Sequence, residues 1–290
     1  MKLSENAMLV RLNISQWTAR KEDKTATRRV ETDFNCKDAG RFNKALIAQE
    51  EIKKIQKIAN EARIFHYTNT LPYSDDGARI LPTSNYFDYT QKLQALKYTF
   101  EKAAETFLVN YPAFIEEAKA RLNGLFNQMD YPPAGKIDKK YSFSTQFDPI
   151  PETLEGIRKE LDSIQQGEID QLNSDLEARI KANIAAANKD LWTRLFETVK
   201  HVSDRLHDKD AIFRDSLINN IIELVKLLPR LNITDDPNLE TMRKEIEARL
   251  CSIRPEAIRE DEQTRKDTAR TADDILKSMT GYLAPVTEAI

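Results

Sequence analysis

The sequence predicts a mainly α-helical protein: a helical hairpin with a minor two-stranded antiparallel sheet, a long coiled-coil-like helix and a C-terminal helical bundle. Glycine is rare, with 7 in 290 residues, and Ala, Leu, Glu and Lys, which favour helix, are common. Apolar residues recur at steps of three and four over most of the chain, which is the spacing of an amphipathic helix. Two segments alternate apolar and polar residues instead, as half-buried strands do.

The two alternating segments are residues 8–17 and 139–147. Because an isolated strand is not stable, we expect them to pair and to close one module, residues 8–150. A second module, residues 151–290, follows the proline-rich turn that separates them.

Two helices lie between the predicted strands. Asp38 is predicted to cap the first, which ends near His66. Thr83 or Ser84 is predicted to cap the second, and Pro112 within it predicts a kink or a break. Both helices are long enough to form an antiparallel hairpin.

One nearly continuous helix is predicted from Pro151 to about Asp208. At about 1.5 Å per residue it would be roughly 85 Å long, so its apolar stripe needs another helix to pack against. Three shorter helices, at 211–228, 237–251 and 255–279, are expected to cover only part of it. The remaining stripe is predicted to meet a protein partner or a second copy, and consists of Ile169, Leu172, Leu176, Ile180 and Ile184.

The segment from Arg11 to Arg29 is basic, and Trp17 lies within it. Cations that follow phosphates, with an aromatic ring that stacks on a base, are typical of nucleic-acid binding. The alternative is a mobile, soluble loop with Trp17 packed on the helical hairpin. The candidate nucleic-acid-binding residues are Arg11, Trp17, Arg20, Lys21, Lys24, Arg28 and Arg29.

Nothing in the sequence predicts a catalytic centre or a cofactor site, because no nucleophile elbow, zinc-protease motif, P-loop or dinucleotide fingerprint is present. His201, Asp204 and Asp208 share one helix face. Neighbouring cations argue against a metal there, and a solvated helix end is the alternative. No signal peptide or membrane-spanning run is recognisable, and two widely spaced cysteines indicate reduced thiols, so we expect a cytoplasmic protein.

Three short motifs resemble an uncharacterised family of phages and bacteria, known only as a domain of unknown function. They are the segment from Ile14 to Lys21, the Tyr131-Pro132 turn, and the run from Phe143 through Pro151. The resemblance spans residues 8–151. It implies a phage origin and a place in a multiprotein machine, since members of the family often neighbour MoxR-like AAA+ ATPases and von Willebrand A-type proteins. No catalytic residues follow from it. We therefore expect a non-enzymatic interaction or assembly protein, with nucleic-acid binding as the alternative.

Overall fold

The computed structural model describes residues 3–151, 166–208 and 214–283, and the protein is mainly α-helical, as predicted. The chain divides into two compact units. Unit 1 comprises residues 1–11, 68–87 and 147–290, and unit 2 comprises residues 12–67 and 88–146. Each unit is thus built from segments that are far apart in the sequence.

The main sheet has four strands in the order β4-β5-β1-β6. They are β4 (Leu71–Pro72), β5 (Arg79–Pro82), β1 (Ala7–Ser15) and β6 (Ser142–Asp148). β1 and β6 are the two predicted strands, and their pairing is confirmed. β5 pairs antiparallel with β1, Met8 opposite Leu81, and with β4. The predicted sheet was too small because β4 and β5 are short and contain prolines, which are typical of loops.

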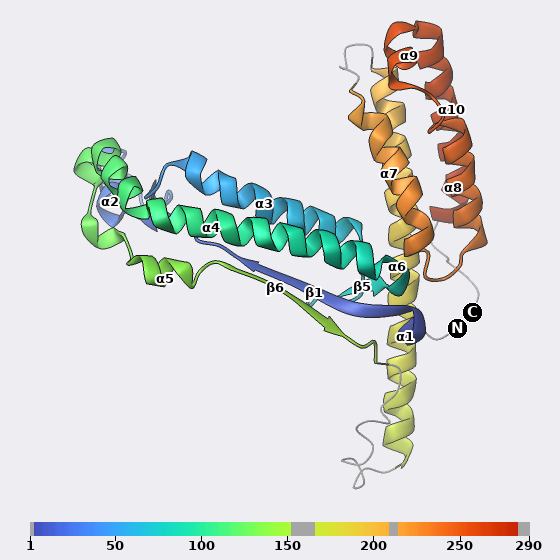
Figure 1. Ribbon diagram of the computed structural model, residues 1–290, viewed down its shortest axis with the longest axis horizontal. Helices are drawn as coiled ribbons and strands as arrows, with labels where there is room; N and C mark the ends of the chain where they lie inside the picture. The colour runs from blue at the N-terminus through green and yellow to red at the C-terminus, as the bar shows by residue number, and fades with distance from the viewer. Residues whose placement is uncertain (1–2, 152–165, 209–213, 284–290) are drawn as a thin grey trace. The chain divides into compact units, whose positions relative to one another are not determined.

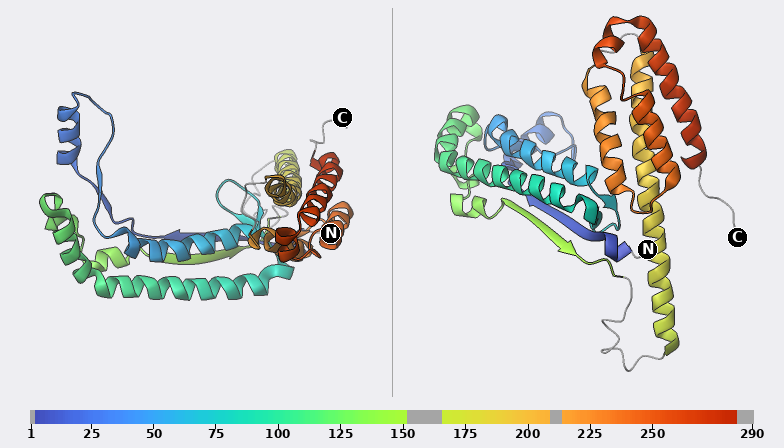
Figure 2. Two further views of the ribbon diagram at one scale, coloured as in Figure 1. Left: turned by 90° about the horizontal axis from the view of Figure 1, so that it is seen from above. Right: turned by 45° about the vertical axis from the view of Figure 1, so that its right-hand side comes forward.

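In unit 2, α3 (Gln49–Thr68) and α4 (Tyr86–Leu122) lie along β1 and β6 (Figure 1). Their buried faces supply the core, which includes Ile55, Tyr89 and Phe100. Pro112 does not break α4, which runs on to Leu122, and Figure 2 shows the helix bending toward its C-terminal end. The predicted helix start at Asp38 is wrong. Asp38 has a left-handed φ of 54°, which a helix start excludes, and the helix begins at Gln49.

The shorter elements of unit 2 lie near the end of the hairpin at which α3 begins and α4 ends (Figure 1). β2 (Arg20–Glu22) and β3 (Asn43–Ala45) form a small antiparallel sheet, and α2 (Lys24–Asp33) lies between them in the sequence. Two 3₁₀ turns, η2 (Asn123–Leu125) and η3 (Gln128–Asp130), lead from α4 to α5 (Ala134–Asp138).

Unit 1 is a helical bundle with β4, β5 and the start of β1 packed on it. One core joins Leu9, Leu71 and Ile80 to the helices. The helices are α1 (Leu3–Asn6), α6 (Gln166–His207), α7 (Ser216–Leu231), α8 (Pro237–Arg249), α9 (Pro255–Glu260) and α10 (Glu262–Leu283), with η1 (Thr83–Asn85) beside them.

Three sequence predictions for unit 1 have different outcomes. The predicted helix 255–279 is divided at Asp261, whose carboxylate accepts bonds from the backbone N–H groups of Gln263 and Thr264 and so caps α10. Asp236 caps α8, as predicted. The first part of the predicted long helix, residues 152–165, lies outside the described residues.

Candidate interaction surfaces

The basic segment folds into β2 and α2. Asp23 caps α2 by accepting bonds from the backbone N–H groups of Thr25 and Ala26. No side chain of α2 is buried, and Val30 and Phe34 at its C-terminal end are 45% and 77% exposed. The helix therefore has little core of its own, and its attachment depends on polar contacts.

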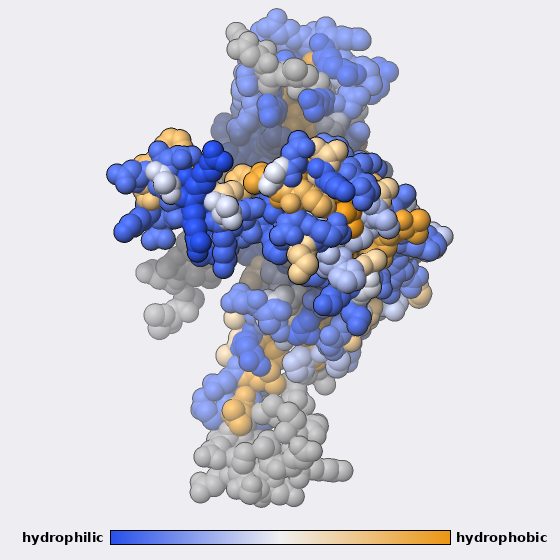
Figure 3. All heavy atoms as spheres, turned by 90° about the vertical axis from the view of Figure 1, so that its left-hand side faces the viewer, coloured by the Kyte–Doolittle hydropathy of each residue, from blue (hydrophilic) through white to orange (hydrophobic). Residues whose placement is uncertain are grey.

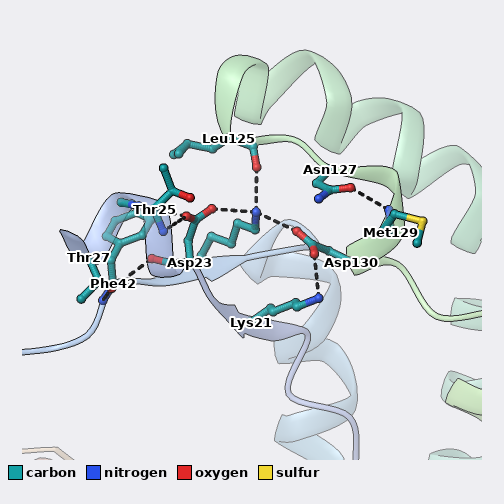
Figure 4. Close-up of polar contacts among 11 residues, drawn as sticks. Lys21, Asp23, Thr25, Thr27, Phe42, Leu125, Asn127, Met129 and Asp130 are labelled. Carbon is teal, nitrogen blue, oxygen red and sulfur yellow. Dashed lines mark hydrogen bonds and ion pairs between the residues drawn. The ribbon is translucent and has the colours of Figure 1, made fainter. Parts of the chain in front are cut away.

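Those contacts centre on Lys44 of β3, whose side chain is only 6% exposed (Figure 4). Its Nζ lies 2.8 Å from Asp23 Oδ2 and 2.7 Å from Asp130 Oδ2, and donates a third bond of 2.8 Å to the carbonyl oxygen of Leu125. Asp130 is also paired with Lys21 at 2.7 Å. The network joins β2, α2, β3 and η3 into one end of unit 2.

The electrostatics of the network favour the charged forms of Lys44, Asp23 and Asp130. Burial lowers the pKa of Lys44, but the bonds to Asp130 and Asp23 outweigh burial and hold that pKa above its usual 10.5. The bond from Lys44 lowers the pKa of Asp23 below 3.8. Burial raises the pKa of Asp130, and the bonds from Lys21 and Lys44 overcome burial and lower it. All three protons of the ammonium group are engaged within this network, the Lys44 anchor, which holds the start of α2 to β3 and η3.

The structure separates the candidate nucleic-acid-binding residues. Arg11 is half-buried in unit 1. Its guanidinium nitrogens lie 2.5 Å from Asp148 Oδ2 and 2.8 Å from Asp76 Oδ2. Trp17 is 7% exposed and packs edge-on against the rings of Phe107 and Tyr111. Lys21 belongs to the anchor just described. Of the candidate residues, the cations that lie on the surface of unit 2 without a place in the anchor are Arg20, Lys24, Arg28 and Arg29.

The candidate interface on α6 has two parts. From Ala187 onward the stripe of α6 belongs to the core of unit 1, together with α7, α8 and α10. Before that point Leu172 is 45% exposed, Ile180 and Ile184 are half-buried and Leu176 is buried. Figure 2 shows this N-terminal part of α6 extending past the bundle. Ile169 lies in the helix, but its side chain is outside the described residues.

The polar cluster at the C-terminal end of α6 is built around Asp273. Ser203 Oγ donates a 2.5 Å bond to Asp273 Oδ1, and His207 Nε2 lies 2.9 Å from Asp273 Oδ2. The serine contacts the carboxylate and not the imidazole, so the cluster lacks the hydroxyl-to-base contact of a nucleophilic triad. Across the described residues, no group of three or more His, Cys, Asp or Glu side chains is placed to hold a metal ion, His201, Asp204 and Asp208 included. Both Cys36 and Cys251 are free thiols.

Comparison with known proteins identifies one family. Residues 4–226 match DUF3150, described as a protein of unknown function. The chain belongs to this family. The match extends beyond the resemblance at residues 8–151 and takes in α6 and most of α7. No curated protein and no solved structure matches the chain. Within the described part, no helix is both long and apolar enough to cross a bilayer.

Proposed function

We propose that this DUF3150 protein is a non-enzymatic assembly component that associates with a second copy of itself through the N-terminal part of α6. The observation that carries the proposal is the apolar stripe that continues past the core of unit 1. Leu172 is 45% exposed on this part of the helix. Figure 3 shows hydrophobic atoms along the lowest part of the helix, next to hydrophilic ones. An amphipathic helix that extends beyond its own bundle usually packs on another helix.

The charges along this part of α6 favour an identical partner in an antiparallel arrangement. If two copies cross at Ala178, Leu172 of one copy lies at the level of Ile184 of the other, and Leu176 at the level of Ile180. Asp175 and Arg179 lie on one flank of the stripe, and Glu177 and Lys181 lie on the other. The same alignment therefore brings Asp175 of one copy near Arg179 of the other and Glu177 near Lys181, and all four are exposed. A two-fold interface requires this self-complementarity of one surface patch.

Light scattering of the purified protein tests the proposal. Wild type should have twice the mass of one chain, and the double variant Leu172→Lys with Ile180→Lys should fold with the mass of one chain. Ala178→Lys with Ala182→Lys adds the same charge to exposed positions on the opposite face of α6 and should remain dimeric. Asp175→Lys should weaken the dimer, and adding Arg179→Asp should restore it. A strictly monomeric wild type contradicts the proposal.

The larger assembly follows from the family resemblance. We place the protein in a cytoplasmic complex of phage origin, with an AAA+ ATPase as the partner that the resemblance implies. Affinity purification from expressing cells, followed by mass spectrometry, tests this. Recovery of the protein with no ATPase contradicts it.

Nucleic-acid binding through α2 is the second candidate. Lys24 and Arg28 lie one turn apart on α2 and line a shallow groove with Arg41. The same groove contains Glu22, Glu31 and Asp38, so its charges balance. If nucleic acid binds there, affinity should fall steeply as salt rises from about 50 mM, and Arg28→Glu with Arg29→Glu should weaken it further. An absence of binding at low salt removes this candidate.

A further inference from the structure

A groove of about 420 Å³ lies in unit 2 between α4 and the start of β6. Its floor is apolar and includes Phe100, Ala104, Leu108 and Phe143. Val109 on its rim is 75% exposed. The groove is independent of α6 and of the Lys44 anchor.

The strand beside the groove is at the edge of its sheet. β6 has β1 as its neighbour on one side, and within the described residues no strand lies on the other. Its first residues, Ser142 to Thr145, include no charged residue and no proline. Natural proteins usually protect an exposed edge with such residues, because its backbone groups can pair with another strand. An extended peptide that pairs with β6 would place alternate side chains toward the groove.

Two features indicate the chemistry of that peptide. The groove is lined by three carboxylates, Glu101, Glu105 and Asp138, and by no cation. Glu101 and Glu105 do have lysine neighbours on α4, at 3.8 Å and 2.7 Å, but exposed pairs of this kind contribute at most about 1 kcal/mol and can be exchanged. The carboxylates therefore favour a ligand that carries Lys or Arg.

Tyr141 supplies the second feature. Tyr141 lines the groove, and its hydroxyl is buried with no hydrogen-bond partner among the described residues. Burial raises its pKa, so it remains a neutral phenol that can donate or accept. A buried polar group without a partner costs free energy. A polar group of a bound ligand would remove that cost once a shift of the Tyr141 ring opens its hydroxyl to the groove.

We propose that the edge of β6 and the adjacent groove bind an extended peptide segment of a partner protein, with apolar side chains directed into the groove and Lys or Arg at its ends. The backbone of the peptide adds a strand to β6, and the carboxylates select its charge. This site is additional to the self-association through α6, and variants at one surface leave the other unchanged.

Fluorescence polarisation with a synthetic peptide of sequence Lys-Thr-Val-Thr-Val-Thr-Lys tests the proposal on the full chain. Its alternate Lys and Val side chains can all face the groove. The peptide with Glu at both ends should bind at least about tenfold more weakly, because two attractive charge pairs become repulsive. N-methylation of alternate amides in the two possible registers should give one form that binds and one that does not, since only one set of amides faces β6.

Variants locate the binding surface. Glu101→Lys with Glu105→Lys should weaken binding about tenfold. Glu116→Lys with Glu117→Lys makes the same change in net charge at exposed positions farther along α4 and should bind as wild type does. Circular dichroism confirms that each variant is folded.

Four results would overturn the proposal. They are the absence of binding to wild type, equal weakening by both pairs of variants, equal binding of the two methylated forms, and a dimer that Thr145→Lys separates. The last of these would assign the edge of β6 to a second copy.

Discussion

Replacing Lys44 with methionine should destabilise unit 2 strongly. The substitution removes three hydrogen bonds. It also removes the cation shared by the carboxylates of Asp23 and Asp130, whose side chains are only 12% and 7% exposed. Breaking a buried ion pair from one side costs about 3–5 kcal/mol. Asp130 retains its bond from Lys21, and Asp23 retains its two backbone amides, so we expect the lower end of that range.

Urea unfolding measures this loss with tryptophan as the probe. The chain has two tryptophans, Trp17 in unit 2 and Trp192 in unit 1. In a Trp192→Phe background the signal reports unit 2 alone. A loss of about 3 kcal/mol lowers the urea midpoint by about 1–3 M. Lys24→Met removes an exposed lysine and should change stability by less than about 0.5 kcal/mol.

A second substitution separates the buried charge from simple loss of packing. Adding Asp130→Asn to Lys44→Met removes one of the two stranded carboxylates, so the double variant should be more stable than the single one. If Lys44→Met were as stable as Lys24→Met, or if Asp130→Asn made the single variant worse, the network would not be the anchor of α2.

Three further predictions concern stability. Phe143→Asp should unfold unit 2, because Phe143 is 5% exposed and packs on Phe100; an unchanged melting temperature by circular dichroism would contradict the packing of β6. In acid, unit 2 should lose stability as pH falls through the lowered pKa values of Asp23 and Asp130, and the stability should be complete above about pH 5; a urea midpoint that is flat from pH 6 to about 2.5 would argue against this. Asp236→Ala should cost about 1–2 kcal/mol, since Asp236 caps α8 and accepts a 3.0 Å bond from Trp192 Nε1; the Trp192 signal in a Trp17→Phe background measures this loss, and a cost below about 0.5 kcal/mol would contradict it.

The sequence was sufficient to predict the elements that have a strong period. β1, β6 and the main helices were found because each buries one face, and burial imposes a regular spacing on apolar residues. The pairing of β1 with β6 followed from stability, since neither strand could remain alone.

The parts that depend on distant contacts were not predictable. Lys44, Asp23 and Asp130 look like ordinary surface charges in sequence, and only the fold brings them together. Likewise, Arg11 and Lys21 were predicted to contact phosphates, and their distant carboxylate partners gave no local signal. The burial of Trp17 against α4 agrees with the alternative interpretation of the basic segment, in which Trp17 packs on the hairpin, but the sequence alone did not decide between the two interpretations.

The segmented construction of unit 1 has a consequence for synthesis on the ribosome. Leu9 of β1 shares its core with Leu71 and Ile80 and with helices that begin at Gln166 or later, so most of that core emerges only after more than half of the chain has been made. Contacts between such distant residues make folding slow, and they leave an apolar strand exposed while translation continues. Nascent chains that stop before α6 should therefore bind chaperones or aggregate, and full-length chains released from the ribosome should acquire protease resistance in unit 1 last.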